Sequence, residues 1–315
     1  MIQVSHLTKI YGPRTAINDL NFEVKAGEIV GFLGPNGAGK STTMKILTGL
    51  MPASSGTAKI AGFDVFENPI EVKRNVGFLP ETPPLYLEMS VTDYLEFAAE
   101  IHGVERSQLK KAVSNALEKT ALGDVRNRLI GNLSKGYRQR VGLAQALVHD
   151  PKVLILDEAS VGLDPKQIIE IRQLIKGLGG EHTIILSSHI LPEVTATCQR
   201  IIVINQGQIV ATDTIEQLTR RINKGSTYLM TVQKPILAGI EAFRHLPGVK
   251  AVSIHEQRIS IELSESTGEL RPQLLEAAVK NGMGVLEFTS EKLSLEEIFL
   301  QLTTVETPST SGTGV

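Results

Sequence analysis

The sequence has little cysteine: Cys198 is the only one among 315 residues. A single cysteine excludes an internal disulfide and a cysteine-based zinc cluster, and it fits a reducing cytoplasm. The seven histidines show neither H-x₃-H nor H-E-x-x-H spacing, so they do not indicate a histidine metal site. No run of about 18 apolar residues occurs, so we expect no membrane-spanning helix. The start of the sequence also lacks the charged and apolar regions of a signal peptide.

A strong charge of either sign is missing as well. The formal net charge is −2, and no block of lysine and arginine stands out. Proteins that work on nucleic acid are usually more basic, so no nucleic-acid partner is expected. Hydrophobic residues make up 42% of the chain and charged residues 21%, which is typical of ordered globular proteins. The length predicts about two domains.

The most informative stretch that is present lies at residues 34–42. It fits the pattern G-x-x-x-x-G-K-[ST] of a phosphate-binding loop. An apolar segment from Glu28 to Leu33 precedes it as a predicted strand, and a helical pattern from Gly39 to Leu50 follows. A strand, a glycine-rich loop and a helix N-terminus together form an anion site, because backbone N–H groups face the phosphates. The predicted ATP-binding residues of the loop are Gly34, Pro35, Asn36, Gly37, Ala38, Gly39, Lys40, Ser41 and Thr42.

Side chains with suitable chemistry complete this site. In the loop, Lys40 provides a charge for the β- and γ-phosphates, and the Ser41 hydroxyl suits Mg²⁺. Asp157 and Glu158 directly follow a short apolar strand, and His189 follows another. Ligands of open α/β sheets bind beyond the carboxyl ends of the strands, so these side chains are expected beside the loop. The first acid suits Mg²⁺, the second can deprotonate an attacking water, and the histidine can contact a γ-phosphate.

Two further features each allow two interpretations. Tyr11 lies in a Gly/Pro turn before the loop strand, where its ring either stacks on adenine or only packs against its own turn. Ser134 is a suitable N-cap for the helix that follows it. Together with Lys135 and the helix N-terminus, it forms either a second anion site or nothing more than a capped helix.

The predicted elements divide the chain into two domains. Residues 1–222 form an α/β domain with the short apolar strands of a parallel sheet. A helical subdomain interrupts it over about residues 83–150, with helical periodicity at 91–101, 107–122 and 137–148. The other predicted strands lie near 2–7, 20–25, 57–61, 76–79, 153–156, 183–186, 200–204 and 208–211, and the other predicted helices near 165–178, 192–197 and 214–222.

The second domain is smaller and follows a predicted linker at 223–226. Over residues 227–303 the element order is β-α-β-β-α-β, the ferredoxin-like arrangement of an α+β domain, with a last helix from Ser294. We interpret it as a packing or dimer-contact domain, because it holds no cluster of titratable groups suited to catalysis. The tail, residues 304–315, is rich in serine, threonine, glycine and proline and is predicted to be disordered.

Taken together, the motifs resemble those of ABC-type ATPases, the nucleotide-binding subunits of ABC transporters. The resemblance covers about residues 1–220 and is specific, because several motifs occur in the family's order. Residues 34–42 are similar to the Walker A loop, 153–158 to the Walker B strand, and 133–137 to the signature usually written LSGGQ. Gly162 to Asp164 resembles the D-loop, and Glu81 stands where the family usually has the Q-loop glutamine.

The resemblance implies a P-loop ATPase that uses ATP and Mg²⁺. Tyr11 would stack on adenine, and Glu158 and His189 would act in hydrolysis. In this family two subunits face each other head to tail, so that each ATP lies between two chains. The residues implied to bind the partner's nucleotide are Ser134, Lys135, Gly136 and Asp164, and those implied to hold the metal are Ser41, Asp157 and Glu81.

The resemblance also implies partners and a location. Sequence variants around Glu81 and Ser134 are similar to the branch that serves drug-export and gliding-motility type exporters. ATP would close a homodimer or a dimer with a paralogue, and hydrolysis would open it. The cycle would drive a separate transmembrane permease, docked between Glu81 and the helices of residues 91–149, at the cytoplasmic face of the membrane. The alternatives are a soluble ABC ATPase acting on ribosomes or DNA, and a P-loop small-molecule kinase.

Overall fold

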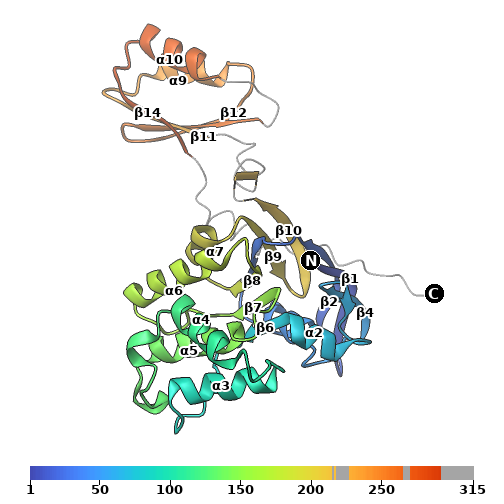
Figure 1. Ribbon diagram of the computed structural model, residues 1–315. Coiled ribbons are helices and arrows are strands. Elements are labelled where there is room, and N and C mark those ends of the chain that lie inside the picture. The colour runs from blue at the N-terminus through green and yellow to red at the C-terminus, as the bar shows by residue number, and fades with distance from the viewer. Residues whose placement is uncertain (215, 218–226, 265–269, 292–315) are drawn as a thin grey trace, which may run out of the picture. The chain divides into compact units, whose positions relative to one another are not determined.

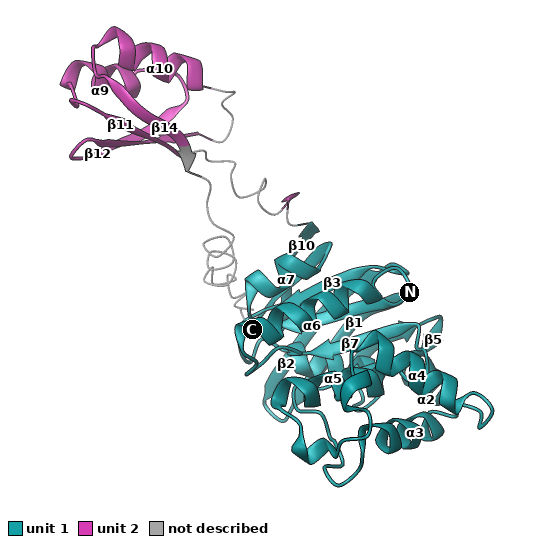
Figure 2. Cartoon of the chain, turned by 60° about the vertical axis from the view of Figure 1, so that its left-hand side comes forward, with its two compact units in different colours: residues 1–215, 302–315 teal, residues 216–301 magenta. Residues whose placement is uncertain are grey.

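The computed structural model describes residues 1–214, 216–217, 227–264 and 270–291. The chain divides into two compact units, with residues 1–215 in the first and 216–301 in the second (Figure 2). The predicted linker at 223–226 and the tail at 304–315 lie outside the described residues. The predicted domain boundary at residue 222 therefore stays a prediction.

The N-terminal sheet of the first unit is antiparallel, with the order β2-β1-β4-β5. Its first two strands are longer than predicted, because irregular pairing interrupts the alternation of apolar and polar residues by which a strand is predicted. Register shifts interrupt the pairing of β1 with β2, and His6 and Asp19 have positive φ angles of 51° and 53°. Such bulges break the two-residue alternation by which a strand is recognised. The strands are β1 (Ile2–Tyr11), β2 (Arg14–Val24), β4 (Ser55–Ile60) and β5 (Phe63–Asp64).

The central sheet has six strands in the order β10-β9-β3-β8-β7-β6. All are parallel except β10, which pairs antiparallel with β9. Every residue of β3, β7 and β8 is buried, as predicted for strands covered on both faces. Because β3, β8 and β7 are neighbouring parallel strands, their carboxyl ends meet at one edge of the sheet. The strands are β3 (Ile29–Leu33), β6 (Val76–Leu79), β7 (Val153–Asp157), β8 (Thr183–Ser188), β9 (Arg200–Asn205) and β10 (Gln208–Thr214).

Helix α1 shares one hydrophobic core with strands of both sheets. It ends earlier than predicted, because Gly49 takes a positive φ of 68°. The N–H groups of Gly49 and Leu50 then donate to the carbonyls of Ile46 and Lys45 at 2.9 Å each, which is a Schellman motif. The helices of this part are α1 (Lys40–Leu47), α2 (Pro69–Asn75), α6 (Pro165–Leu178) and α7 (Leu191–Thr197), of which α2 was not predicted.

The predicted helical subdomain is present and has a core of its own. Helices α3 (Val91–Ile101), α4 (Leu109–Lys119) and α5 (Lys135–Leu147) form it, with two short 3₁₀ turns between α4 and α5. Figure 1 shows the three helices gathered beside the end of the central sheet that β6 occupies. Helix α5 thus contributes side chains to the subdomain core and also packs against β6 of the central sheet.

The second unit has the sheet order β12-β13-β11-β14, with all neighbours antiparallel. Helices α9 and α10 lie on one face of this sheet (Figure 1), and the alternate residues Tyr228, Met230 and Val232 of β11 belong to the core beneath them. This confirms the ferredoxin-like order. The predicted helix from Ser294 and most of the one from Thr214 lie outside the described residues. The elements are β11 (Thr227–Val232), α9 (Leu237–Arg244), β12 (Val249–His255), β13 (Arg258–Leu263), α10 (Arg271–Lys280) and β14 (Val285–Glu291).

Candidate nucleotide-binding site

The loop between β3 and α1 is held against the rest of the sheet edge. The Gly34 N–H donates to the carbonyl of Ser188, which ends β8, at 3.4 Å. A side chain at position 34 would place its Cβ 2.3 Å from the carbonyl oxygen of Ile204, so glycine is required there. Gly39 caps α1 with φ 110°, a conformation that other residues rarely adopt. The backbone of the loop is therefore fixed at both ends.

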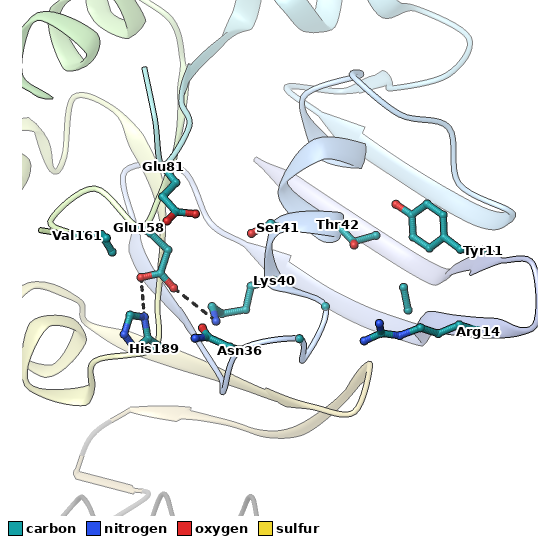
Figure 3. Close-up of a pocket in the computed structure, with 13 residues that line it drawn as sticks. Tyr11, Arg14, Asn36, Lys40, Ser41, Thr42, Glu81, Glu158, Val161 and His189 are labelled. Carbon is teal, nitrogen blue, oxygen red and sulfur yellow. Dashed lines mark hydrogen bonds and ion pairs between the residues drawn. The ribbon is translucent and has the colours of Figure 1, made fainter. Parts of the chain in front are cut away.

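A pocket of about 550 Å³ opens over this loop (Figure 3). It brings together residues from β1, β2, the loop, α1 and the segments that follow β6, β7 and β8. Gly34, Pro35 and Ala38 do not line it, although they were predicted with the loop. The lining residues are Tyr11, Arg14, Ala16, Asn36, Gly37, Gly39, Lys40, Ser41, Thr42, Glu81, Glu158, Val161 and His189.

Lys40, Glu158 and His189 form a continuous polar contact at the floor of the pocket (Figure 3). Lys40 Nζ donates to the carbonyls of Gly34 at 2.8 Å and Pro35 at 3.2 Å, and lies 3.5 Å from Glu158 Oε1. The other carboxylate oxygen, Oε2, is 2.8 Å from His189 Nδ1. The side chains of Lys40 and Glu158 are only 6% and 8% exposed. The predicted base and histidine thus lie in contact beside the loop lysine.

The backbone of Glu158 is strained. Its φ is 51°, in the left-handed region, and its N–H donates to the Ser187 carbonyl at 3.0 Å. A non-glycine residue in this region costs on the order of 1 kcal/mol or more. This conformation directs the Glu158 side chain to Lys40 and His189, so the contact is made at the expense of backbone energy.

Asp157 lies one residue earlier, at the end of β7, and is 4% exposed. Its Oδ1 has no hydrogen-bond partner among the described residues. It does not line the pocket of Figure 3 but lines the neighbouring one, together with Ser41 and Glu81. A buried carboxylate oxygen without a partner is costly, which indicates a group that binds there. The three predicted metal ligands thus share one pocket and offer only oxygen donors, as Mg²⁺ prefers.

Tyr11 and Arg14 stand at the far end of the pocket. They are paired residues that close the β1–β2 hairpin across Gly12 and Pro13. The Tyr11 hydroxyl donates to Met51 Sδ at 2.7 Å, while the residue remains 42% exposed and lines the pocket. The geometry allows both interpretations at once, with the hydroxyl anchored and the ring open to a base. Sequence reasoning missed Arg14, which the short Gly-Pro turn after Tyr11 would have indicated.

The four residues predicted to act on a partner's nucleotide form a separate group. Ser134 caps α5 by accepting from the Tyr137 N–H at 3.4 Å, as predicted. Asp164 caps α6 by accepting from the Gln167 N–H at 2.9 Å. The two helix starts are close, because a Cβ on Gly136 would lie 2.6 Å from Gln167 Cδ. None of Ser134, Lys135, Gly136 and Asp164 is among the residues that line the pocket over their own chain's loop.

A second pocket, of about 690 Å³, lies where the helical subdomain meets the sheet. Glu81 lines this pocket as well as the one over the loop. The helical subdomain also presents exposed apolar side chains, among them Tyr86 and Ile101, which are 48% and 67% exposed. The second pocket is lined by Ser41, Lys45, Thr48, Leu50, Lys73, Val76, Phe78, Pro80, Glu81, Thr82, Pro84, His102, Gln145, Ala146 and Asp157.

Comparison with known proteins agrees with this geometry. The family described as "ABC transporter" matches residues 17–161, and "ATP-binding protein DrrA1-3-like, C-terminal domain" matches residues 214–303. The bacitracin transport ATP-binding protein BcrA of Bacillus licheniformis is 35% identical over 304 residues, which cover 96% of this chain and 97% of BcrA. The linearmycin resistance ATP-binding protein LnrL of Bacillus subtilis (strain 168) is 32% identical over 305 residues, covering 96% and 98%.

A solved structure shows the same fold with reaction products bound. It is the dimeric post-hydrolysis state of the ATP-binding cassette MJ0796 with ADP and Pi, at 25% identity and a TM-score of 0.62, covering 68% of this chain and 99% of that one. The fold and the pocket therefore define a P-loop ATPase of the ABC type. The chain belongs to the ATP-binding subunits of ABC transporters, in the branch with a DrrA-like C-terminal domain.

This confirms the predicted family, fold class and activity. The protein binds ATP and hydrolyses it as the ATP-binding subunit of a transporter. The relatives favour transport over the alternative of a soluble ABC ATPase acting on ribosomes or DNA. None of the helices in the described parts of the chain combines the length and the apolar character needed to cross a membrane.

Proposed function

We propose that each ATP is bound between two chains, and that the pocket over the loop is half of the complete site. The observation that carries this is the separation of the two polar groups described above. Ser134, Lys135, Gly136 and Asp164 lie together but outside their own chain's pocket. The N-terminus of α5 and the charge of Lys135 suit the phosphates of a nucleotide held by the facing chain. The facing chain is a second copy or a paralogue.

Within the pocket, hydrolysis is assigned to Glu158 and His189. Lys40, which bonds to loop carbonyls in the structure, would move its charge onto the β- and γ-phosphates. Glu158 would accept the proton of the attacking water, and its contact with Lys40 and His189 keeps its carboxylate in the line of attack. His189 would hold the γ-phosphate and steady Glu158. Asn36, Gly37, Gly39 and Thr42 provide the surrounding loop.

Mg²⁺ fits the oxygen donors of Ser41, Asp157 and Glu81. The described residues contain no group of three or more His, Cys, Asp or Glu side chains placed to hold an ion alone. An ion here would thus depend on phosphate oxygens, as is usual for Mg²⁺ in nucleotide sites. When bound, it would neutralise charge on the phosphates during transfer. Glu81 would add a carboxylate where the family usually has an amide.

The remaining pocket residues suit the nucleoside and the inner phosphates. The exposed Tyr11 ring offers a face on which adenine can stack, and Met51 holds its hydroxyl. Arg14 lies close to the loop, since a Cβ on Gly37 would be 3.7 Å from Arg14 Nη2. Its guanidinium is therefore placed to approach a phosphate oxygen.

The membrane partner is a separate permease subunit that docks in the second pocket, between the sheet and the helical subdomain. The exposed apolar residues Tyr86, Phe97 and Ile101 provide a surface for a cytoplasmic segment of that subunit. Glu81 lines both pockets, so a movement at the docking site reaches the nucleotide directly. The chain would thus act at the cytoplasmic face of the membrane, and export is the direction of transport suggested by the resistance function in the name of the linearmycin relative.

The test is to block hydrolysis and observe assembly. Glu158→Gln keeps the shape of the side chain but removes the base, so ATP should accumulate in a closed dimer. We expect the purified full chain to elute as a dimer with ATP and Mg²⁺ and as a monomer with ADP, measured by light scattering. A variant that binds ATP and stays monomeric at saturation would count against two copies of this chain sharing the site.

A further inference from the structure

The segment that carries His189 is bonded to two other parts of the site through its backbone. The carbonyl of Ser187 accepts from the Glu158 N–H at 3.0 Å. The carbonyl of the next residue, Ser188, accepts from the Gly34 N–H at 3.4 Å. A shift of this segment would thus move the base and the phosphate loop as well as the histidine.

The Ser188 side chain fixes the backbone on both sides of His189. It is 1% exposed, and its Oγ accepts from the Ile190 N–H at 3.0 Å. The same hydroxyl donates its proton to Glu193 Oε2, also at 3.0 Å. Because a hydroxyl has one proton, the bond to Glu193 leaves its lone pairs for Ile190. Glu193 thereby sets the orientation of the Ser188 hydroxyl, which closes the turn around His189.

Glu193 itself is an unusual residue for its position. It lies in the first turn of α7, is only 7% exposed, and its Oε1 has no hydrogen-bond partner among the described residues. It shares a small cavity with Ser160, which follows Glu158 by two residues, with the polar side chains Arg172 and Thr197, and with apolar side chains such as Ile171 and Leu186. A buried carboxyl group with one unsatisfied oxygen reduces stability, and a hydrophobic residue would fill this space at lower cost.

We propose that Glu193 is a positioning residue for ATP hydrolysis. Acting through Ser188, it holds His189 in contact with Glu158, so that the histidine and the base stay in line for the attacking water. Loss of the Glu193–Ser188 bond frees the hydroxyl to turn away from the Ile190 N–H, and the histidine then loses its fixed backbone. This inference rests on the proposed roles of Glu158 and His189.

The experiment measures steady-state ATP hydrolysis by the full chain. Glu193→Ala and Ser188→Ala should lower kcat roughly ten-fold, with KM for ATP changed less than about two-fold, because one oriented hydrogen bond is lost and binding contacts remain. Glu193→Gln keeps an oxygen that can accept from Ser188 and should recover most of the activity. On the same helix, the Thr195 hydroxyl donates to the carbonyl of Pro192, away from Ser188 and His189, so Thr195→Ala should behave as wild type.

A double variant separates positioning from a general effect on folding. In a His189→Ala background, Glu193→Ala should cause no further loss of kcat, because the residue it positions is gone. An equal loss in both backgrounds, or an unchanged kcat in Glu193→Ala, would overturn the inference. If His189→Ala leaves kcat unchanged, the proposed role of His189 fails as well. If the Glu193 variants leave kcat unchanged while His189→Ala lowers it, the proposed role of His189 stands and this inference alone fails.

Discussion

The positive φ of Glu158 predicts that this residue is held in its conformation at a cost in protein stability. Two variants isolate that cost, because Glu158→Ala and Glu158→Gly remove the same contacts with Lys40 and His189. Only the glycine variant also relieves the positive φ of 51°. The difference between the two variants therefore measures the backbone strain, free of the lost side-chain interactions.

The expected difference follows from two opposing terms. A left-handed conformation costs an L-residue about 1–2 kcal/mol. Glycine relieves this cost, but it also makes the unfolded chain more flexible, which offsets about 0.4–1 kcal/mol of the stability gained. Glu158→Gly should thus be about 0.5–1 kcal/mol more stable than Glu158→Ala, which is about 2 °C in unfolding temperature for a unit of this size. Both variants should lack ATP hydrolysis.

The assay is differential scanning calorimetry of the full chain without nucleotide. The transition of the first unit is identified in the wild type as the one that ATP shifts upward. Hydrolysis assays on the same preparations confirm that both variants are inactive. A glycine variant less stable than the alanine variant by about 0.4–1 kcal/mol, the full effect of glycine's flexibility, would show that the backbone at position 158 is unstrained and would refute the reasoning.

Three further predictions concern the loop, the adenine end and the response to pH. Gly34→Ala should abolish ATP binding in isothermal titration calorimetry, because its Cβ would lie 2.3 Å from the Ile204 carbonyl; unchanged affinity would contradict this placement. Tyr11→Ala should weaken ATP binding about ten-fold, whereas Tyr11→Phe, which keeps the ring, should bind as wild type. Burial lowers the pKa of His149 from 6.5 to about 4. The unfolded chain then takes up the proton first, so stability should fall by up to about 3 kcal/mol as the pH drops from 6.5 to 4. His149→Gln should flatten that slope in urea titrations, and an unchanged slope would contradict the assignment.

Much of the first unit was predictable because its strands and motifs are local in the sequence. The buried strands β3, β7 and β8 are short apolar runs, and each is followed by the residues that meet at the pocket. The hairpin of β1 and β2 was underestimated, because positive φ angles at His6 and Asp19 disturb its alternation. Arg14 was missed for a related reason: its place in the pocket depends on a turn that folds two strands together.

Other features lie beyond sequence reasoning because they depend on long-range packing. The strain at Glu158 and the unpartnered oxygen of Asp157 appear only when separate strands are brought side by side. The sequence placed Asp157, Ser41 and Glu81 at one metal site, whereas only the structure shows that Ser41 and Glu81 line both the pocket over the loop and its neighbour. The connection between the two pockets is therefore a property of the fold.

The central claim is that the loop of one chain and the signature residues of another enclose the same ATP. The direct measurement is cross-linking between two preparations, one with Asn36→Cys and the other with Ser134→Cys, both in the Glu158→Gln background. The native Cys198 is buried at 7% exposure, which leaves the introduced thiols as the reactive pair. With ATP and Mg²⁺, a short bismaleimide should join the two different chains into a covalent dimer, and neither preparation alone should give that product. Efficient cross-linking that ignores ATP, or none in the mixture at saturating ATP, would contradict the shared site.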